Sequence, residues 1–269
     1  MANDAALNAP AAPWRHVAAL RNPWLLAGLA LLTLLGLWSA TGTTPVAVAL
    51  LWKWLPSLLR GLLVNIEISV LAVALGTLVG LVVGALLLSP SKPVQRLARL
   101  YVQAFRNVPL LVLIYFTTYV FPFEVHIGPW SFAFPDWLKV VLGLALPTSA
   151  NVAEIFRGAI QSIPSAQWEA AQSLAFRRRE ILRLIVLPQC LRRMLPPWMN
   201  LYASITMSTS LASLVGVHDV VDMAQIASNT VVRTDFTILV YFTLLALFFA
   251  YCYPIARATR ALERRHERH

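Results

Sequence analysis

Apolar residues along this chain gather in long runs without charge, and most lysines and arginines lie in the segments between these runs. A helix needs roughly 20 mostly apolar residues to cross the hydrocarbon core of a membrane. Backbone groups inside lipid must be paired within the segment, which favours helices for such runs. The pattern predicts an all-α, polytopic membrane protein with about six transmembrane helices, over residues 23–40, 61–89, 100–121, 137–160, 194–217 and 236–255.

The basic residues set the predicted orientation. If the segments between spans alternate sides, 18 of the 22 lysines and arginines fall on one side. Cytoplasmic segments carry such an excess, so both termini are expected in the cytoplasm. The predicted order is a cytoplasmic leader (1–22), an extra N-terminal transmembrane helix (23–40), an external segment with an interfacial helix (41–60), a five-helix core (61–256) and a basic cytoplasmic tail near lipid headgroups (257–269).

The composition of the chain supports a membrane protein, and its residues argue against several other functions. The chain is 58% hydrophobic and 13% charged, a balance that a water-soluble domain of this size would not keep in solution. Its formal net charge of +10 does not predict a nucleic-acid partner, because the basic residues are spread between apolar runs. No glycine-rich phosphate loop ends in Lys-Ser or Lys-Thr, so an enzyme that hydrolyses ATP is not expected. His126 lacks a spaced partner, so no metal site is expected.

The long cytoplasmic loop at 161–193 is predicted to form two short helices. Ser165 can cap the first, in which Trp168, Ala171, Leu174 and Ala175 share one face at helical spacing. A second amphipathic turn covers 181–186, and the chain is expected to break before the next span at Pro188, Pro196 and Pro197. Composition alone favours an ordinary loop anchored by arginines, with a docking helix for a soluble partner as the alternative.

Particular residues in this loop resemble a known signature. Glu169-Ala170-Ala171, then Ala175, then Ile185-Val186-Leu187-Pro188 are similar to the EAA motif of bacterial ABC importer permeases, which carries glycine where this chain has Ala175. Three further segments resemble those of the polar amino acid subfamily (histidine, glutamine, arginine and opine-like solutes), at 105–111, 153–158 and 209–213. Lysine often stands in such permeases where this chain has Met207.

The resemblance implies a type I ABC importer permease core in a bacterial inner membrane, working by alternating access. It implies that ATP and magnesium bind to partner ATPase subunits and that this chain binds no cofactor. The other implied partners are a second permease copy or related permease, a periplasmic or extracellular solute-binding protein, an amino acid substrate and membrane lipid. The implied coupling helix consists of Glu169, Ala170, Ala171, Leu174, Ala175 and Phe176.

Polar side chains within the predicted spans are candidates for a solute path, because such groups are costly in lipid without a partner. Glu154 and Asn151 are three residues apart on one helical face, where they could receive the ammonium of an amino acid. Glu154 could equally form an ion pair with Arg106 or Arg157. The full set of candidates is Asn65, Glu67, Ser149, Asn151, Glu154, Ser208, Thr209 and Ser210.

A secondary transporter or channel is the alternative function. In such a protein a buried acid, for which Glu154 is the candidate, would serve as a proton or ion site. Many secondary transporters are built from inverted repeats, and this sequence shows no internal repeat. The EAA-like loop favours the importer, in which energy comes from another chain.

Overall fold

The computed structural model describes residues 45–127 and 130–266. Three of its helices are long and apolar enough to cross a membrane, or four if the bent pair α3 and α4 counts as one span. The expected all-α membrane fold is confirmed, with a short β-hairpin as an addition, while the span predicted at 23–40 lies outside the described residues. The elements are α2 (Pro45–Leu87), α3 (Lys92–Asn107), α4 (Leu110–Val120), β1 (Glu124–Ile127), β2 (Trp130–Ala133), α5 (Asp136–Gln161), α6 (Ser165–Ser173), α7 (Arg178–Glu180), η2 (Ile181–Val186), α8 (Leu187–Ser208), η3 (Thr209–Val215), α9 (Val220–Val231) and α10 (Thr234–His266).

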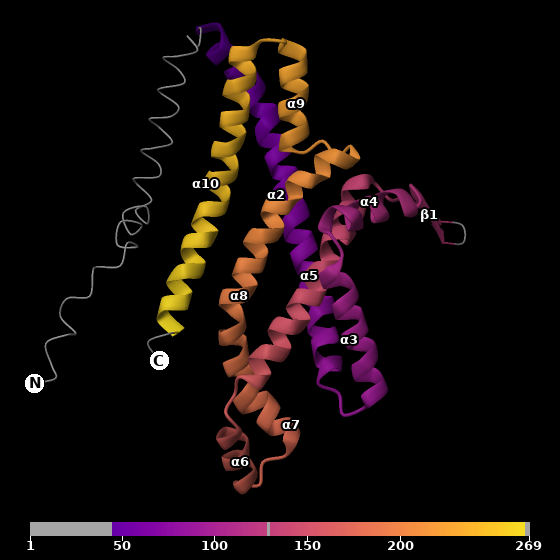
Figure 1. The fold of residues 1–269 in the computed structure, drawn as a ribbon, viewed down its shortest axis with the longest axis vertical. Helices are drawn as coiled ribbons and strands as arrows, with labels where there is room; N and C mark the ends of the chain where they lie inside the picture. The colour runs from indigo at the N-terminus through magenta and orange to yellow at the C-terminus, as the bar shows by residue number, and fades with distance from the viewer. Residues whose placement is uncertain (1–44, 128–129, 267–269) are drawn as a thin grey trace, which may run out of the picture.

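The long helices define the shape of the molecule. Figure 1 shows α2, α5, α8 and α10 running roughly along its long axis. The short helices α6 and α7 lie at one end, and α9 with the start of α10 lies at the other. The hairpin of β1 and β2 projects from one side beyond α4. The loop that resembles the EAA motif therefore occupies one extremity of the helix bundle.

Residues 45–60, expected as an interfacial helix that leads into the next span, are helical and continuous with that span. They are the first part of α2, a continuous helix of 43 residues that contains Pro56. Their side chains are also drawn into the protein, since Ala47 and Leu58 are fully buried in a cluster with Phe236 and Val240 of α10. Packing against α9 and α10 therefore keeps this segment in line with the span.

Close packing of α2 on α5 is made possible by three glycines spaced four apart. A Cβ on Gly76 would lie 2.6 Å from Thr148 side-chain atoms, and one on Gly80 would lie 2.6 Å from the Ser149 carbonyl oxygen. A Cβ on Gly84 would lie 2.8 Å from the Phe156 ring. Small residues at such spacing let membrane helices approach closely. This glycine seam fixes the position of α5 relative to α2.

The span expected at 100–121 is two helices with a bend of 102° between α3 and α4. Val108 and Pro109 separate them, and Val108 is extended with φ −87° and ψ 133°. A residue before proline is driven out of the helical region, because the proline ring crowds its backbone. The proline therefore turns the chain, and α3 runs alongside α5 while α4 crosses it at an angle (Figure 1).

The hairpin between α4 and α5 pairs β1 with β2 in antiparallel register, with Glu124 opposite Ala133. Next to it, the Lys139 side chain is fully buried, although the sequence placed it among external basic residues. Its Nζ lies 3.0 Å from Asp136 Oδ1 and 3.7 Å from the centre of the Phe123 ring. The ion pair and the ring compensate for burial of the ammonium.

The three prolines after the loop do not break the chain. A helical run continues from Arg178 to Ser208, with Pro188, Pro196 and Pro197 inside α8 and the π-helical segment η2 before it. The Leu187 N–H bonds to the Leu182 carbonyl, five residues back. Such widening relieves the crowding that a proline ring imposes on the preceding turn. The span expected at 194–217 is thus the later part of α8 followed by the tighter turns of η3.

Candidate functional site

The helix α6 is attached firmly to the ends of its neighbours. Its inward side chains are Ala171, which is buried, and Trp168, which is half-buried. They pack in a cluster with Ile163 after α5, Ile181 in η2 and Cys190 in α8. Ser165 is the first helical residue and not the expected cap, since Pro164 holds the cap position and no side chain caps the helix. Hydrophobic contacts position α6 instead.

The C-terminal end of α6 corrects a second expectation. Leu174 and Ala175 were assigned to the helix face with Trp168, but the helix ends at Ser173. Ala175 has φ +63°, in the left-handed region. The Ala175 N–H donates to the Gln172 carbonyl and the Phe176 N–H to the Ala171 carbonyl. This is the hydrogen-bond pattern of a Schellman cap, whose left-handed position favours glycine.

The outer surface of α6 is open to a partner. Leu174 is 73% exposed and Phe176 is 38% exposed, just beyond the helix. Glu169 and Ala170 are exposed on the helix itself. The tip thus presents a carboxylate, a small backbone-like patch and two apolar side chains. Exposed apolar groups on a rigid projection are typical of a protein-protein contact.

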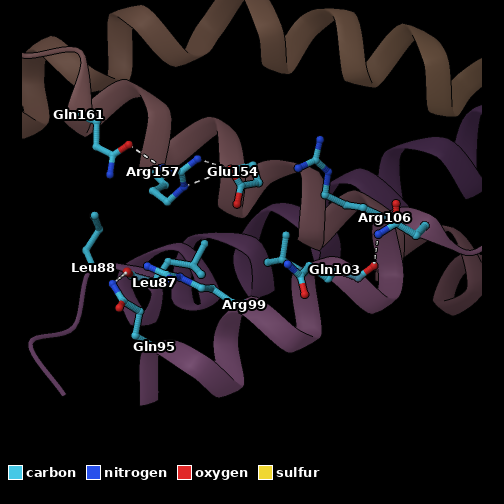
Figure 2. Close-up of a pocket in the computed structure, with 11 residues that line it drawn as sticks. Leu87, Leu88, Gln95, Arg99, Gln103, Arg106, Glu154, Arg157 and Gln161 are labelled. Atoms are coloured by element: carbon cyan, nitrogen blue, oxygen red, sulfur yellow. Dashed lines mark hydrogen bonds and ion pairs between the residues drawn. The ribbon is translucent and has the colours of Figure 1, made fainter. Parts of the chain in front are cut away.

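A cavity of about 630 Å³ lies between α3, α5 and the end of α2. Figure 2 shows Arg99 and Arg106 on the α3 wall, with Glu154 and Arg157 on the α5 wall. Glu154 Oε2 accepts hydrogen bonds from Arg157, at 2.6 Å from Nη2 and 3.1 Å from Nε. Of the two arginine partners considered for Glu154, Arg157 is the one the structure pairs with it. The other residues that line the cavity are Leu87, Leu88, Gln95, Val102, Gln103, Asn107 and Gln161.

A second polar cluster is closed inside the protein. The Asn65 amide nitrogen donates to Thr209 Oγ1 at 3.1 Å and to Asp219 Oδ2 at 3.0 Å. The Asn65 amide oxygen accepts from the Val220 N–H at 3.0 Å. Burial raises the pKa of Asp219 from its usual 3.8 to about 6, and the bonds from Asp222 N–H and Asn65 limit the rise. Asn65 and Thr209 therefore join α2 to η3 and α9.

The remaining solute-path candidates do not form one site. Ser149 is buried and its hydroxyl lies 2.7 Å from the Tyr101 hydroxyl. Asn151 donates to the Pro147 carbonyl and does not line the cavity that contains Glu154. Ser208 and Ser210 donate to carbonyls of the preceding turn. Glu67 is exposed on α2, and no hydrogen bond or ion pair joins it to another residue in the described ranges.

Two sets of residues that contribute to the polar clusters of the structure were not among the candidates from the sequence. Arg99 and Gln103 line the cavity with Arg106, and their spacing of four and three residues on an amphipathic helix was a usable signal. Asp219 is buried at the start of α9, where it accepts a hydrogen bond from Asp222 N–H as a helix cap. An aspartate directly before an apolar helix is a recognisable cap signal.

Helices long enough to span a membrane make this a membrane protein, and the exposed helical tip fixed to their ends is its most prominent candidate contact surface. The family model for the binding-protein-dependent transport system inner membrane component matches residues 76–268, and the chain belongs to this family. The named relatives described next are transport system permease proteins, and this chain is a permease subunit rather than an enzyme.

Named relatives and solved structures agree with this family. The octopine transport system permease protein OccM of Rhizobium radiobacter is 33% identical over 222 residues, covering 81% of this chain and 89% of the relative. The L-cystine transport system permease protein TcyB of Bacillus subtilis is 29% identical, covering 80% and 88%. A crystal structure of an amino acid ABC transporter with histidines superposes with a TM-score of 0.69 at 26% identity, covering 80% and 96%. The MetNI methionine ABC transporter, at 17% identity and TM-score 0.56, shares the fold.

Proposed function

We propose that this chain is the permease subunit through which an ATP-binding-cassette importer moves a polar or charged amino acid, or a related opine-like compound, into the cytoplasm. The observation that carries the proposal is the tip of α6, which is exposed on one side and seated in the hydrophobic cluster on the other. Relatives named for octopine, cystine and glutamine transport support the solute class.

Coupling follows from the way α6 is held. An ATPase groove would receive Glu169, Ala170, Leu174, Ala175 and Phe176, which lie on the outside, while Ala171 anchors the helix from within. Since the cluster joins α6 to the ends of α5 and α8, movement of the groove would move those helices as a unit. ATP and magnesium bind to the ATPase subunits, and this chain connects the movement of those subunits to its membrane helices.

The solute path is proposed to lie between this chain and a second permease copy or related permease. The exposed Glu67 carboxylate supports this arrangement, because its neighbours on the same face of α2, Leu63 and Val70, are 62% and 47% exposed apolar residues. A carboxylate among them needs water, a solute or a protein partner rather than lipid. Ser208 and Ser210 reach the surface elsewhere and are further candidates, whereas Asn65, Ser149 and Thr209 are assigned to packing and Glu154 to its ion pair with Arg157.

A solute-binding protein would deliver the solute at the face opposite α6, and both termini of the chain are proposed to lie in the cytoplasm. The excess of arginines around α6, from Arg177 to Arg193, supports this orientation. The alternative function as a secondary transporter requires a carboxylate free to exchange ions. Glu154, the residue proposed for that role, is committed to Arg157.

Affinity purification of the tagged chain from its native membrane, followed by identification of the bound proteins, tests the proposal. An ATPase subunit in the eluate is expected. A Glu169→Lys variant should retain normal abundance but lose most solute uptake, because it sets a cation against the groove. Glu124→Lys, a matched charge reversal on the exposed strand β1, should keep uptake. Repeated purification without an ATPase, or normal uptake by Glu169→Lys, would refute the coupling role.

A further inference from the structure

The cavity between α3 and α5 holds more positive charge than the chain itself neutralises. Three arginines and one glutamate line it. Arg157 is engaged by Glu154 and by the Gln161 side chain. Arg99 and Arg106 form no hydrogen bond or ion pair with any residue in 45–127 or 130–266. Two guanidinium groups are therefore available to a ligand from outside the chain.

The two free arginines are arranged to act together. They are seven residues apart on α3, which is two helical turns, and Gln103 lies between them on the same face. Figure 2 shows all three on the wall opposite Glu154 and Arg157. A guanidinium is a planar fork of donors that binds two oxygens of a phosphate at once. The cavity is thus suited to an anion with several oxygens.

Apolar residues lie at one end of this cavity and on the outer side of α3. Leu87 and Leu88, at the end of α2, form part of the cavity wall. On the outer side of α3, Leu97 is 70% exposed and Leu100 is 63% exposed. A freely dissolved anion has no use for such leucines, whereas a phospholipid presents acyl chains beside its phosphate. At about 630 Å³ the cavity is within the size range of small-molecule sites.

We propose that this cavity binds the headgroup of an anionic phospholipid. Arg99 and Arg106 contact the phosphate oxygens, and the acyl chains lie along the exposed leucines of α3. Much of α3 lies in the half of the molecule that carries α6 (Figure 1), and the segment from Arg177 to Arg193 that follows α6 is rich in arginine. Basic pockets between membrane helices on the cytoplasmic side bind such headgroups by the same chemistry. The bound lipid would brace α3 against α5.

The test uses the complex as it purifies from the membrane, in mild detergent, and measures retained phospholipid by native mass spectrometry. Removing both charge-assisted contacts in the Arg99→Gln/Arg106→Gln double variant should lower phosphatidylglycerol retention at least about tenfold. Arg96→Gln is the matched control, because Arg96 is an exposed arginine of the same helix that does not line the cavity. It should retain lipid as the unaltered protein does.

Two further measurements separate misfolding and other anions from the proposed site. The Arg99→Lys/Arg106→Lys variant keeps the charge and should recover part of the retention, with an unchanged thermal midpoint. Adding millimolar inorganic phosphate should not displace the lipid, because the acyl contacts remain. Equal retention in all variants, or equal loss in Arg96→Gln, would overturn the proposal. Displacement by phosphate would reassign the cavity to a dissolved anion and would also overturn it.

Discussion

Two polar clusters inside the same helical bundle are built in opposite ways. Around Asn65, every polar atom of the amide is paired, and the cluster is sealed between α2, η3 and α9. Between α3 and α5, Glu154 and Arg157 satisfy each other, while Arg99 and Arg106 project into an open cavity. Both clusters contain a carboxylate. Among the described residues, the cavity between α3 and α5 also has hydrogen-bond donors without a partner, on Arg99 and Arg106, whereas the Asn65 amide has none.

The contrast separates groups that hold the fold from groups that await a ligand. A buried polar atom stripped of its partner costs more than its hydrogen bond contributed, so the closed cluster is a structural joint. In the open cavity water can replace a lost contact, so changes there cost little stability. Stability measurements on matched variants can break or sharpen this distinction.

The largest effect is expected from Asn65→Ala. The change removes three hydrogen bonds and leaves Asp219 buried beside an empty space, which should lower the free energy of unfolding by about 3 kcal/mol. The thermal midpoint of the purified protein in detergent measures the loss. Asn151→Ala is the control, since within the described part of the chain its side chain makes one hydrogen bond, to the Pro147 carbonyl. Equal midpoints for the two variants would show that the cluster is not a joint.

A smaller loss of stability is expected from a substitution in the glycine seam between α2 and α5. Gly80→Val places a side chain against the Ser149 carbonyl and Val152, and overpacking of this kind costs about 2 kcal/mol. Gly158→Ala, on the same helix pair, meets no atom within 4 Å and should be neutral or slightly stabilising. Detergent melting curves of both variants test the seam. A tolerated Gly80→Val would mean that α2 and α5 can separate freely.

At the α6 tip the expected change has the opposite sign. Ala175→Gly removes the side chain from a residue with φ +63° and should stabilise the cap by about 1 kcal/mol. The same substitution at Ala170, within the helix, should destabilise α6 by a similar amount. Hydrogen exchange of residues 165–177 reports both. Faster exchange in Ala175→Gly would contradict the left-handed cap.

The smallest effect belongs to the open cavity. Glu154→Gln breaks the pair with Arg157, but both side chains are partly exposed, at 26% and 35%. The free energy of unfolding should change by less than about 1 kcal/mol. The same melting assay measures it beside Asn65→Ala. A loss as large as that of Asn65→Ala would mean that the two clusters are equivalent, and the comparison would fail.

The sequence predicted the membrane class and the short helix in the loop at 161–193 because both depend on local patterns. Apolar runs revealed α2, α5 and α10, and the motif around Glu169 located α6. It could not show that Pro109 bends one span or that η2 accommodates Pro188, since these depend on how backbone bonds are redistributed. It also grouped eight polar residues into one path, because helical spacing does not show whether a side chain is sealed by a distant helix.

Ala175 shows that the effect of a small departure from a motif depends on the local backbone conformation. From the sequence, alanine in place of glycine is a mild change within a helix. In the structure it lies past the helix end with a left-handed backbone, where glycine has a physical advantage. A left-handed cap at the end of α6 therefore gives a physical reason for the motif's glycine.

Site-specific photocrosslinking at the α6 tip tests the central claim most directly. A photoreactive residue replaces Leu174, which is 73% exposed at the tip, or Leu97, which is 70% exposed on α3 and serves as the matched control. In native membranes, position 174 should form a covalent product with the ATPase subunit, and position 97 should not. If position 174 gives no ATPase product, or if both positions give it equally, α6 is not the coupling helix.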